Sequence, residues 1–270
     1  MRESPLGQPT EYSDEYAPGV LFAVPRAVAR DILGLGTELP FTGADVWNAW
    51  ELTWMNSDGK PVIATATLIV DATSPNVIES KSLKLYLNSF AMTRYVSADA
   101  VATLMTADLS RTAGADVAVD IVTTADASVS PISNFAGACI DDLDMAVLPD
   151  EVDAPLLRCE SGEIVSEALH SHLLRSNCPV TSQPDMGSLL VRYCGPKIDR
   201  SSLLRYIVSY RQHNDFHEAC VERIFVDIKN RCAPDTLTVY ARYNRRGGLD
   251  INPFRTDTDQ APENSRLWRQ

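Results

Sequence analysis

The feature that most constrains the fold is an internal repeat with a shift of 120 residues. Shifted by that amount, segment 82–90 (SLKLYLNSF) lies on segment 202–210 (SLLRYIVSY), with four identities in nine positions. Glu79 then falls on Asp199. The match is short, but the order of predicted elements is also the same in both halves. A duplicated module is therefore the better interpretation.

Both halves are predicted to run strand, strand, helix, helix, strand, from the alternation or helical spacing of their apolar residues. The elements of the first half are strands 50–54 and 62–70, helices 82–93 and 97–114, and strand 116–123. Those of the second half are strands 165–173 and 189–193, helices 200–212 and 215–230, and a final strand 237–241. Each module is then an antiparallel sheet with two helices on one face, which is the α+β class.

Charge limits the partners. The chain has 24 Lys and Arg against 36 Asp and Glu, a net charge of -12, whereas binding of a nucleic-acid backbone needs a basic face. Six acids and no base fall in 141–153, which together with Pro149 and Pro155 predicts an exposed connector. We therefore expect an N-terminal module 1–140, a connector 141–158 and a C-terminal module 159–270.

The compartment is predicted from what the chain does not contain. It has no apolar stretch of about 18 residues that would span a membrane, and its start has no apolar core of a secretory signal. The six cysteines are then expected to be reduced thiols in the cytoplasm rather than a disulfide framework.

One cysteine differs from the other five in its surroundings. Cys178 lies in segment 176–179 (SNCP), where Asn and Pro break regular structure, so it is predicted in a loop that a substrate can reach. Most such thiols are passive, because only those with a low pKa react. Asp185 follows where the chain re-enters a strand. It either belongs to a turn or folds back toward Cys178 as a general acid.

Three further segments each allow two interpretations. His217 and Glu218 open the last helix after Asn214, a predicted N-cap; they either suit the helix dipole or point into a cleft. Segment 79–84 (ESKSLK) is either a capped helix start or a site for a polar heterocycle and a phosphate. Segment 245–248 (RRGG) is either a charged turn or a place where the backbone approaches an anion.

Other site types are not indicated. The single G-x-G, at 34–36, lacks the third glycine of a dinucleotide fingerprint. His170 and His172 would share a strand face. With four histidines and no C-x-x-C or H-E-x-x-H, a zinc site is not expected, so the metal prediction is none.

Taken together, these motifs resemble the NADPH-dependent nitrile reductases of queuosine biosynthesis, in their long, two-module subtype. That family reduces 7-cyano-7-deazaguanine to 7-aminomethyl-7-deazaguanine. The resemblance covers nearly the whole chain and implies the tunnelling fold, whose tandem modules build barrels, and a homodimer. The segments that carry it are 79–86 (ESKSLKLY), 176–179 (SNCP), 183–185 (QPD), 216–218 (FHE) and 243–253 (YNRRGGLDINP).

The resemblance also implies roles for individual residues. Cys178 would attack the nitrile carbon to form a covalent thioimide, Asp185 would protonate the nitrogen, and His217 would hold the base and help proton transfer. Two NADPH molecules would each deliver a hydride. The substrate-binding residues would be Ile78, Glu79, Ser80, Phe216, His217 and Glu218. The NADPH-binding residues would be Ser80, Lys81, Arg246 and Gly247.

Two alternatives remain. One is a zinc-dependent GTP cyclohydrolase with the same fold, which would want a histidine close after its cysteine, whereas this chain has Thr181 there. The other is a non-catalytic purine- or pterin-binding module, which would keep Glu79 and Glu218 but would not need Cys178 and Asp185 together.

Overall fold

The computed structural model describes residues 13–128, 131–145, 149 and 151–270, and the chain forms two compact units. Unit 1 comprises Met1–Val28, Asp45–Ser130 and Arg245–Ile251. Unit 2 comprises Ala29–Ala44, Pro131–Asn244 and Asn252–Gln270. Each unit is therefore built from three separate stretches of the sequence, and the chain passes from one unit to the other several times.

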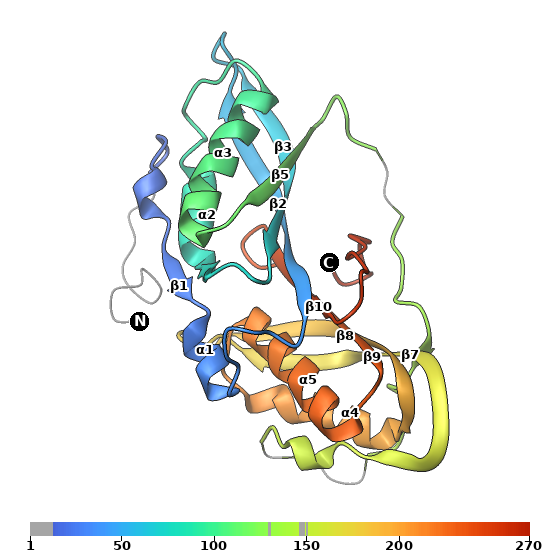
Figure 1. The fold of residues 1–270 in the computed structure, drawn as a ribbon. Helices are drawn as coiled ribbons and strands as arrows, with labels where there is room; N and C mark the ends of the chain where they lie inside the picture. The colour runs from blue at the N-terminus through green and yellow to red at the C-terminus, as the bar shows by residue number, and fades with distance from the viewer. Residues whose placement is uncertain (1–12, 129–130, 146–148, 150) are drawn as a thin grey trace. The chain divides into compact units, whose positions relative to one another are not determined.

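Unit 1 packs two helices against one face of a sheet (Figure 1). In this sheet β3 lies between β2 and β5, and it pairs with β5 in antiparallel fashion; β1 and β4 form a separate antiparallel pair. Leu83 and Phe90 from α2 and Met105 from α3 fill the core against Trp54 and Leu68. The elements are η1 (Pro18–Val20), β1 (Ala23–Pro25), β2 (Thr42–Met55, from Asp45 onward), β3 (Pro61–Asp71), β4 (Asn76–Ile78), α2 (Ser80–Asn88), α3 (Ala98–Ala113), β5 (Val117–Thr123) and the first residues of β10 (Leu249–Thr256).

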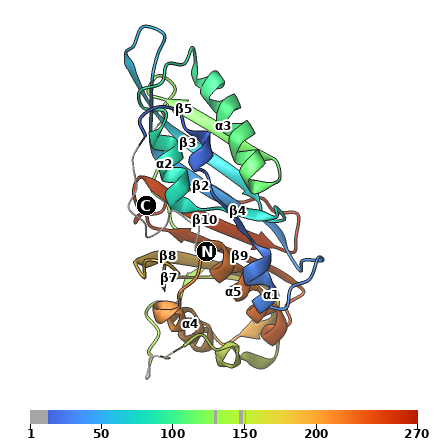
Figure 2. The ribbon, with the colours of Figure 1, turned by 90° about the vertical axis from the view of Figure 1, so that its left-hand side faces the viewer.

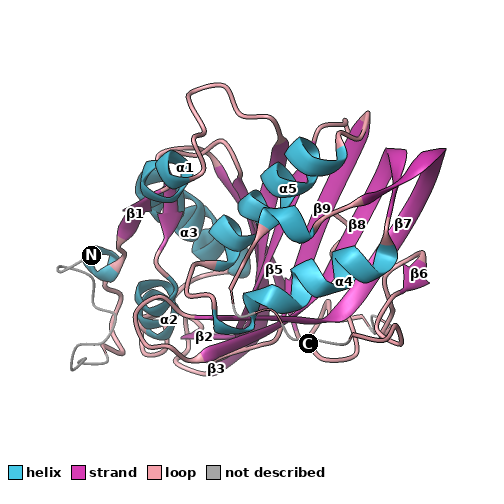
Figure 3. Cartoon of the chain, turned by 90° about the horizontal axis from the view of Figure 1, so that it is seen from below, coloured by secondary structure: helices cyan, strands magenta, loops and turns pink. Residues whose placement is uncertain are grey.

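Unit 2 repeats this arrangement with longer strands. Its strand order is β10-β9-β8-β7-β6, antiparallel except for the last pair, and α4 and α5 cover one face (Figures 2 and 3). Leu189 and Val191 of β8 face Leu203 of α4 and Ile224 of α5 in its core. The elements are most of α1 (Ala27–Ile32), β6 (Ala138–Cys139), η2 (Ala154–Leu156), β7 (Cys159–Asn177), β8 (Pro184–Ile198), α4 (Arg200–Ser209), η3 (Tyr210–Gln212), α5 (His217–Cys232), β9 (Thr236–Tyr243) and the rest of β10.

The starts of α2 and α4 confirm the internal repeat in atomic detail. Glu79 is the N-cap of α2, and its carboxylate accepts from the backbone N–H of Ser82 (2.8 Å). Asp199 is the N-cap of α4 and accepts from that of Ser202 (2.6 Å). Each serine hydroxyl donates back to the carbonyl of its own N-cap residue, at 2.7 Å in both cases. The 120-residue shift thus maps one capped helix start onto the other.

The second helix of each unit is tied to the first by an equivalent buried bond. Tyr86 of α2 donates to Asp108 of α3 (2.8 Å), and Tyr206 of α4 donates to Asp227 of α5 (2.6 Å). Burial raises the pKa of both tyrosines, with the neighbouring carboxylate acting in the same direction, so both hydroxyls stay protonated. The duplication therefore extends to the polar contacts inside the helical layer.

Most predicted elements are confirmed, but several boundaries are wrong: the strands predicted at 50–54, 165–173 and 189–193 are longer, and the helix predicted at 200–212 ends at Ser209. Helix 82–93 starts earlier and ends at Asn88, because Phe90 packs into the core from a turn that continues the apolar spacing. The N-cap of the last helix is Phe216 and not Asn214, since Asp215 accepts the Phe216 N–H (2.8 Å). Strand β10 was not expected: all eight of its residues are buried, so it shows no alternation.

The acidic connector begins on the sheet of unit 2. The N–H of Ile140 donates to the His170 carbonyl (3.0 Å), and the Asp141 carboxylate accepts from the Ser171 hydroxyl (2.6 Å). Four residues of the connector, 146–148 and 150, lie outside the described part of the chain. The three-part domain division remains a prediction.

The helix cap at Asp199 generates a test of stability. Asp199→Ala removes the acceptor of the Ser202 N–H and should lower the free energy of unfolding by about 1 kcal/mol. Ser201→Ala, at an exposed position in the same helical turn, should change it by less than about 0.5 kcal/mol. Urea unfolding followed by circular dichroism measures both. Equal effects of the two substitutions would contradict a capping role.

Candidate functional site

Cys178 is the first residue after β7, in the loop that joins β7 to β8. The loop closes through two backbone bonds: the Cys178 N–H donates to the Gln183 carbonyl (2.8 Å), and the Ser182 N–H donates to the Cys178 carbonyl (3.0 Å). The predicted loop position is confirmed. Cys178 is buried there, at 7% exposed. The closed loop turns its first residue inward while residues 180–184 remain exposed.

The residue before Cys178 connects this loop to the approach of α5. The Asn177 N–H donates to the His213 carbonyl (2.8 Å), and the Asp215 N–H donates to the Asn177 carbonyl (3.1 Å). These two bonds hold segment 213–215 beside the end of β7. Because α5 starts at His217, its first turn is thereby positioned next to the cysteine loop.

Asp185 faces the helices from the start of β8. It pairs with Ser176 across the hairpin, and the two-residue period puts it on the same face as Leu189 and Val191 of the core. It is 3% exposed, and its Oδ1 lies 3.5 Å from Nε2 of His217. The structure thus brings Asp185 and His217 together at the hairpin end that carries Cys178.

The ring of His217 also has an aromatic neighbour. It meets the ring of Tyr243 edge to face, with 4.1 Å between centroids. Tyr243 lies opposite Gly187 in the β8–β9 pairing, and a side chain at Gly187 would meet the tyrosine ring at 3.2 Å. A small residue at position 187 therefore makes room for the ring that supports His217.

A second cysteine lies close to the same acids but differs in its chemistry. Burial raises the pKa of Cys220 well above its usual value, and the negative charges of Asp215 and Asp185 act in the same direction. Such a thiol stays protonated and is a poor nucleophile. Cys220 therefore fits a structural role within α5.

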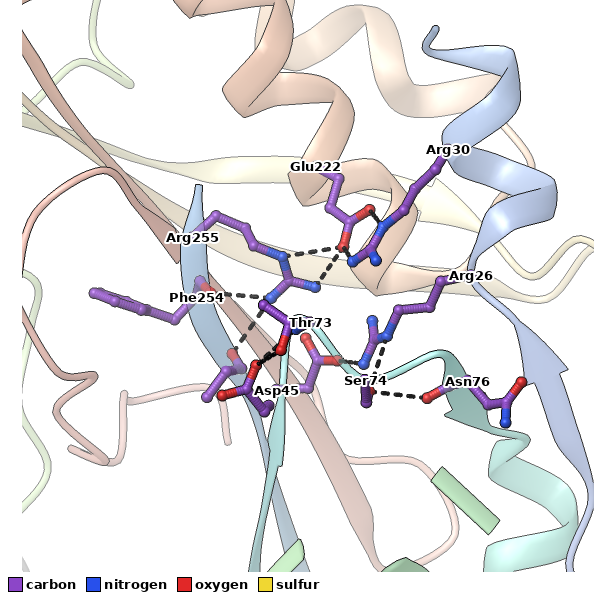
Figure 4. A network of polar contacts seen from close by, with 11 residues as sticks. Arg26, Arg30, Asp45, Thr73, Ser74, Asn76, Glu222, Phe254 and Arg255 are labelled. Carbon is purple, nitrogen blue, oxygen red and sulfur yellow. Dashed lines mark hydrogen bonds and ion pairs between the residues drawn. The ribbon is translucent and has the colours of Figure 1, made fainter. Parts of the chain in front are cut away.

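Glu218 and Glu222 are both buried in the first turns of α5. Glu222 accepts from Arg30 of α1, at 2.9 and 2.7 Å, and from Arg255 of β10, at 3.1 and 2.8 Å (Figure 4). The two guanidiniums hold one carboxylate that lies one turn beyond Glu218. Nothing in the sequence signalled this contact, because Arg30 and Arg255 are far from Glu222 along the chain.

In unit 1 the predicted substrate residues gather around the start of α2. Ile78 ends β4 and is buried, while Ser80 and Lys81 open the helix and are partly exposed. The Glu79 carboxylate is buried and accepts from the N–H groups of Lys81 (2.7 Å) and Ser82 (2.8 Å). The interpretation as a capped helix start is therefore confirmed, and each carboxylate oxygen keeps a further lone pair for a ligand.

Two predicted cofactor residues of unit 1, Arg246 and Gly247, lie in a turn beside α2. Arg246 and Leu249 exchange backbone hydrogen bonds across a tight turn between β9 and β10. Gly247 and Gly248 in this turn have φ of 59° and 78°, which side-chain-bearing residues rarely adopt. The side chain of Lys84 lies 3.3 Å from where a Cβ of Gly247 would be. The turn thus packs on α2 at Lys84, two residues after Ser82.

Comparison with known proteins places these residues in a family. Residues 12–121 match the family model described as "Nitrile reductase, 7-cyano-7-deazaguanine-reductase N-term", and residues 184–262 match "QueF-like protein". The NADPH-dependent 7-cyano-7-deazaguanine reductase of Chromobacterium violaceum is 53% identical over 99% of this chain and 96% of its own. Those of Burkholderia orbicola and Burkholderia multivorans are 52% and 51% identical, each over 99% of this chain and 98% of its own.

The chain belongs to the NADPH-dependent 7-cyano-7-deazaguanine reductase family.

The resemblance inferred from the motifs is therefore confirmed, as is the α+β class. Among the candidate residues, Glu79 lies in the first matched region (12–121). Asp185, His217 and Arg246 lie in the second (184–262). Among solved structures, the apo archaeosine synthase QueF-Like gives a weak likeness: TM-score 0.32 and 17% identity, over 38% of this chain and 100% of that one. No helix in the described residues is long and apolar enough to cross a membrane.

The buried carboxylate of Glu222 makes a second test possible. Glu222→Gln keeps the shape but removes the charge shared by two buried guanidiniums, and it should destabilise unit 2 by about 3–5 kcal/mol. Lys197→Ala breaks the more exposed pairs with Glu160 and Glu163 and should cost less than about 1 kcal/mol. Denaturant unfolding distinguishes them. A loss at Glu222 no larger than that at Lys197 would contradict the anchoring role of this cluster.

Proposed function

We propose that this chain reduces the nitrile of 7-cyano-7-deazaguanine to the primary amine of 7-aminomethyl-7-deazaguanine, with NADPH as reductant, in queuosine biosynthesis. The names of three relatives above 50% identity over almost the full length support the reaction. The single observation that supports its chemistry here is the Asp185–His217 pair, 3.5 Å apart, at the hairpin end that carries Cys178.

In the proposed first step, the thiolate of Cys178 attacks the nitrile carbon and a carbon–sulfur bond forms. The nitrile nitrogen gains a proton as its triple bond becomes a double bond, which gives a thioimide. Asp185 is the proposed donor, because it is the buried acid on the helix-facing side of the same hairpin. His217, in contact with Asp185, would orient the carboxyl group and help proton transfer.

NADPH, when bound, supplies hydride, and two equivalents with two protons convert the thioimide into the amine and free thiol. The residues proposed to hold it are Ser80, Lys81, Arg246 and Gly247. The structure supports this choice in unit 1, because the glycine turn that follows Arg246 packs on Lys84 of α2. Exposed backbone at Gly247 and nearby cationic groups suit a phosphate.

The substrate presents a guanine-like edge with N–H donors, so its partners must be acceptors. Glu79 and Glu218 are proposed for that role, since both are buried carboxylates at helix starts. Phe216, the N-cap of α5, would stack on the heterocycle, and Ile78 and Ser80 would contact it beside Glu79.

The assembly and compartment complete the proposal. We expect a homodimer in which the tandem tunnelling-fold modules build barrels, located in the cytoplasm and without direct binding of nucleic acid. The net charge of -12 supports the last point.

The two alternatives are less well supported. A zinc cyclohydrolase would need a histidine co-ligand close after its cysteine, and the loop after Cys178 has none. A binding module without catalysis would have no use for the Asp185–His217 contact beside a cysteine loop. The relatives' names favour neither.

The covalent step provides the main test of function. Intact-mass analysis after incubation with 7-cyano-7-deazaguanine, without NADPH, should show a gain of one equivalent of nitrile. Cys178→Ala should lose this gain and the reductase activity, whereas Cys220→Ala, a matched truncation of a nearby thiol, should keep the adduct. No gain in the unsubstituted protein, or a gain that survives Cys178→Ala, would reject the role of Cys178.

The choice of cofactor provides another test. A guanidinium matches the 2′-phosphate of NADPH in charge and geometry, so Arg246→Ala should raise the apparent KM for NADPH roughly tenfold and that for NADH much less. Lys60→Ala, on an exposed turn of unit 1, serves as the charge-matched control and should leave both constants unchanged. Steady-state kinetics with each cofactor would show whether the effect is specific. Equal increases for both would mean that Arg246 does not recognise that phosphate.

A further inference from the structure

A cluster of metal-ligand side chains in unit 2 has no part in the proposed reaction. The ligand atoms of Cys139, His170 and His172 all lie within 4.8 Å of one another. Cys139 comes from β6, which pairs in parallel with β7 so that Cys139 is opposite His170. The three side chains therefore converge because of strand register and do not depend on a flexible loop.

This cluster and the candidate catalytic residues lie on opposite faces of the sheet. Ser171 pairs with Leu189, a core residue on the face covered by α4 and α5, and Asp185 shares that face. His170 pairs with Leu190 instead, and its neighbour His172 contacts Ser188, so both rings belong to the other face. A ligand held here would not touch the Cys178 site.

In both imidazole rings Nδ1 has a hydrogen-bond partner outside the cluster. Nδ1 of His170 lies 3.3 Å from the Ala136 carbonyl, which can only accept, so this nitrogen is the donor of that bond and Nε2 is the one that a metal can use. Nδ1 of His172 lies 2.8 Å from the Ser188 hydroxyl. Metal-binding histidines are typically oriented by such a bond from the second ring nitrogen.

The carboxylate of Asp141 holds the segment that carries Cys139 against β7. Asp141 accepts from the Ser171 hydroxyl (2.6 Å) and from the His172 N–H (3.0 Å), both on β7. The Ile140 N–H adds a bond to the His170 carbonyl (3.0 Å). Cys139 is exposed at the end of this clamp, so its sulfur is accessible to an ion from solution.

We propose that Cys139, His170 and His172 form a three-ligand binding site for Zn²⁺. One sulfur and two imidazole nitrogens suit zinc in tetrahedral coordination and do not suit Mg²⁺ or Ca²⁺, which take oxygen ligands. On binding, the Cys139 thiol releases its proton to solvent and its thiolate forms the metal–sulfur bond, and a water takes the fourth position. The ion would stabilise the contact of segment 138–141 with β7. Because Cys178 is not a ligand, this site does not restore the cyclohydrolase alternative.

The experiment titrates Zn²⁺ into the full-length protein after exhaustive dialysis against a chelator, with Co²⁺ as a spectroscopic substitute. We expect one ion per chain, a thiolate-to-cobalt charge-transfer band and a higher Tm in the presence of zinc. Cys139→Ser and His172→Gln should each weaken binding at least tenfold and abolish the Tm increase. Because Cys139 is exposed, its substitution should leave the metal-free fold intact, which far-ultraviolet circular dichroism checks.

Two matched variants locate the site. Cys194 is a partly exposed cysteine of unit 2 that is not in the cluster. The variants Cys194→Ser and Cys178→Ala should both retain one zinc ion with unchanged affinity. Activity of metal-free Cys139→Ser should equal that of the unsubstituted protein. No zinc binding by the unsubstituted protein, or unchanged affinity in Cys139→Ser, would overturn the proposal. Loss of the ion in Cys178→Ala would place the metal at the other cysteine and would overturn it as well.

Discussion

The position of α5 depends on one carboxylate buried between two guanidiniums. Glu222 joins α5 to α1 through Arg30 and to β10 through Arg255, so three segments distant in the sequence share one charge centre. Removing such charges from water is costly, and only close, multiple hydrogen bonds offset that cost. The cost has a structural consequence. The first turn of α5, with His217 and Glu218, cannot shift without breaking this centre.

The duplicated frame shows where the two units have diverged. Both keep the capped start of the first helix and the tyrosine–carboxylate bond between helices. They differ at the ends of elements: β2 and β3 are joined by a polar turn at 56–60, whereas β7 and β8 are joined by the closed loop of Cys178. The shared contacts stabilise the fold in both units. The loops at the strand ends are not needed for those contacts, so they can differ and carry functional residues.

How well the sequence predicted a feature depends on how far apart in the sequence the contacting residues lie. Local signals worked: the helix predicted at 97–114 is α3, with Ser97 as its N-cap and Gly114 as its C-cap. Contacts set by strand register or by distant ion pairs could not be seen. Cys139 lies 31 positions before His170 and reaches it only through the β6–β7 pairing, so a sequence with four histidines and no C-x-x-C or H-E-x-x-H did not indicate zinc. The burial of Cys178 likewise depends on backbone bonds to segment 213–215.

Four of the six cysteines show why residue type alone does not assign a role. Burial raises the pKa of Cys220 well above its usual value and that of Cys232 to about 12, so both remain neutral apolar groups at physiological pH. Cys139 is exposed beside two oriented imidazoles, which is a metal-ligand environment. Cys178 is held by backbone bonds at the end of a hairpin that also carries an acid in contact with a histidine. A thiol becomes a structural group, a ligand or a nucleophile through the neighbours that the fold provides.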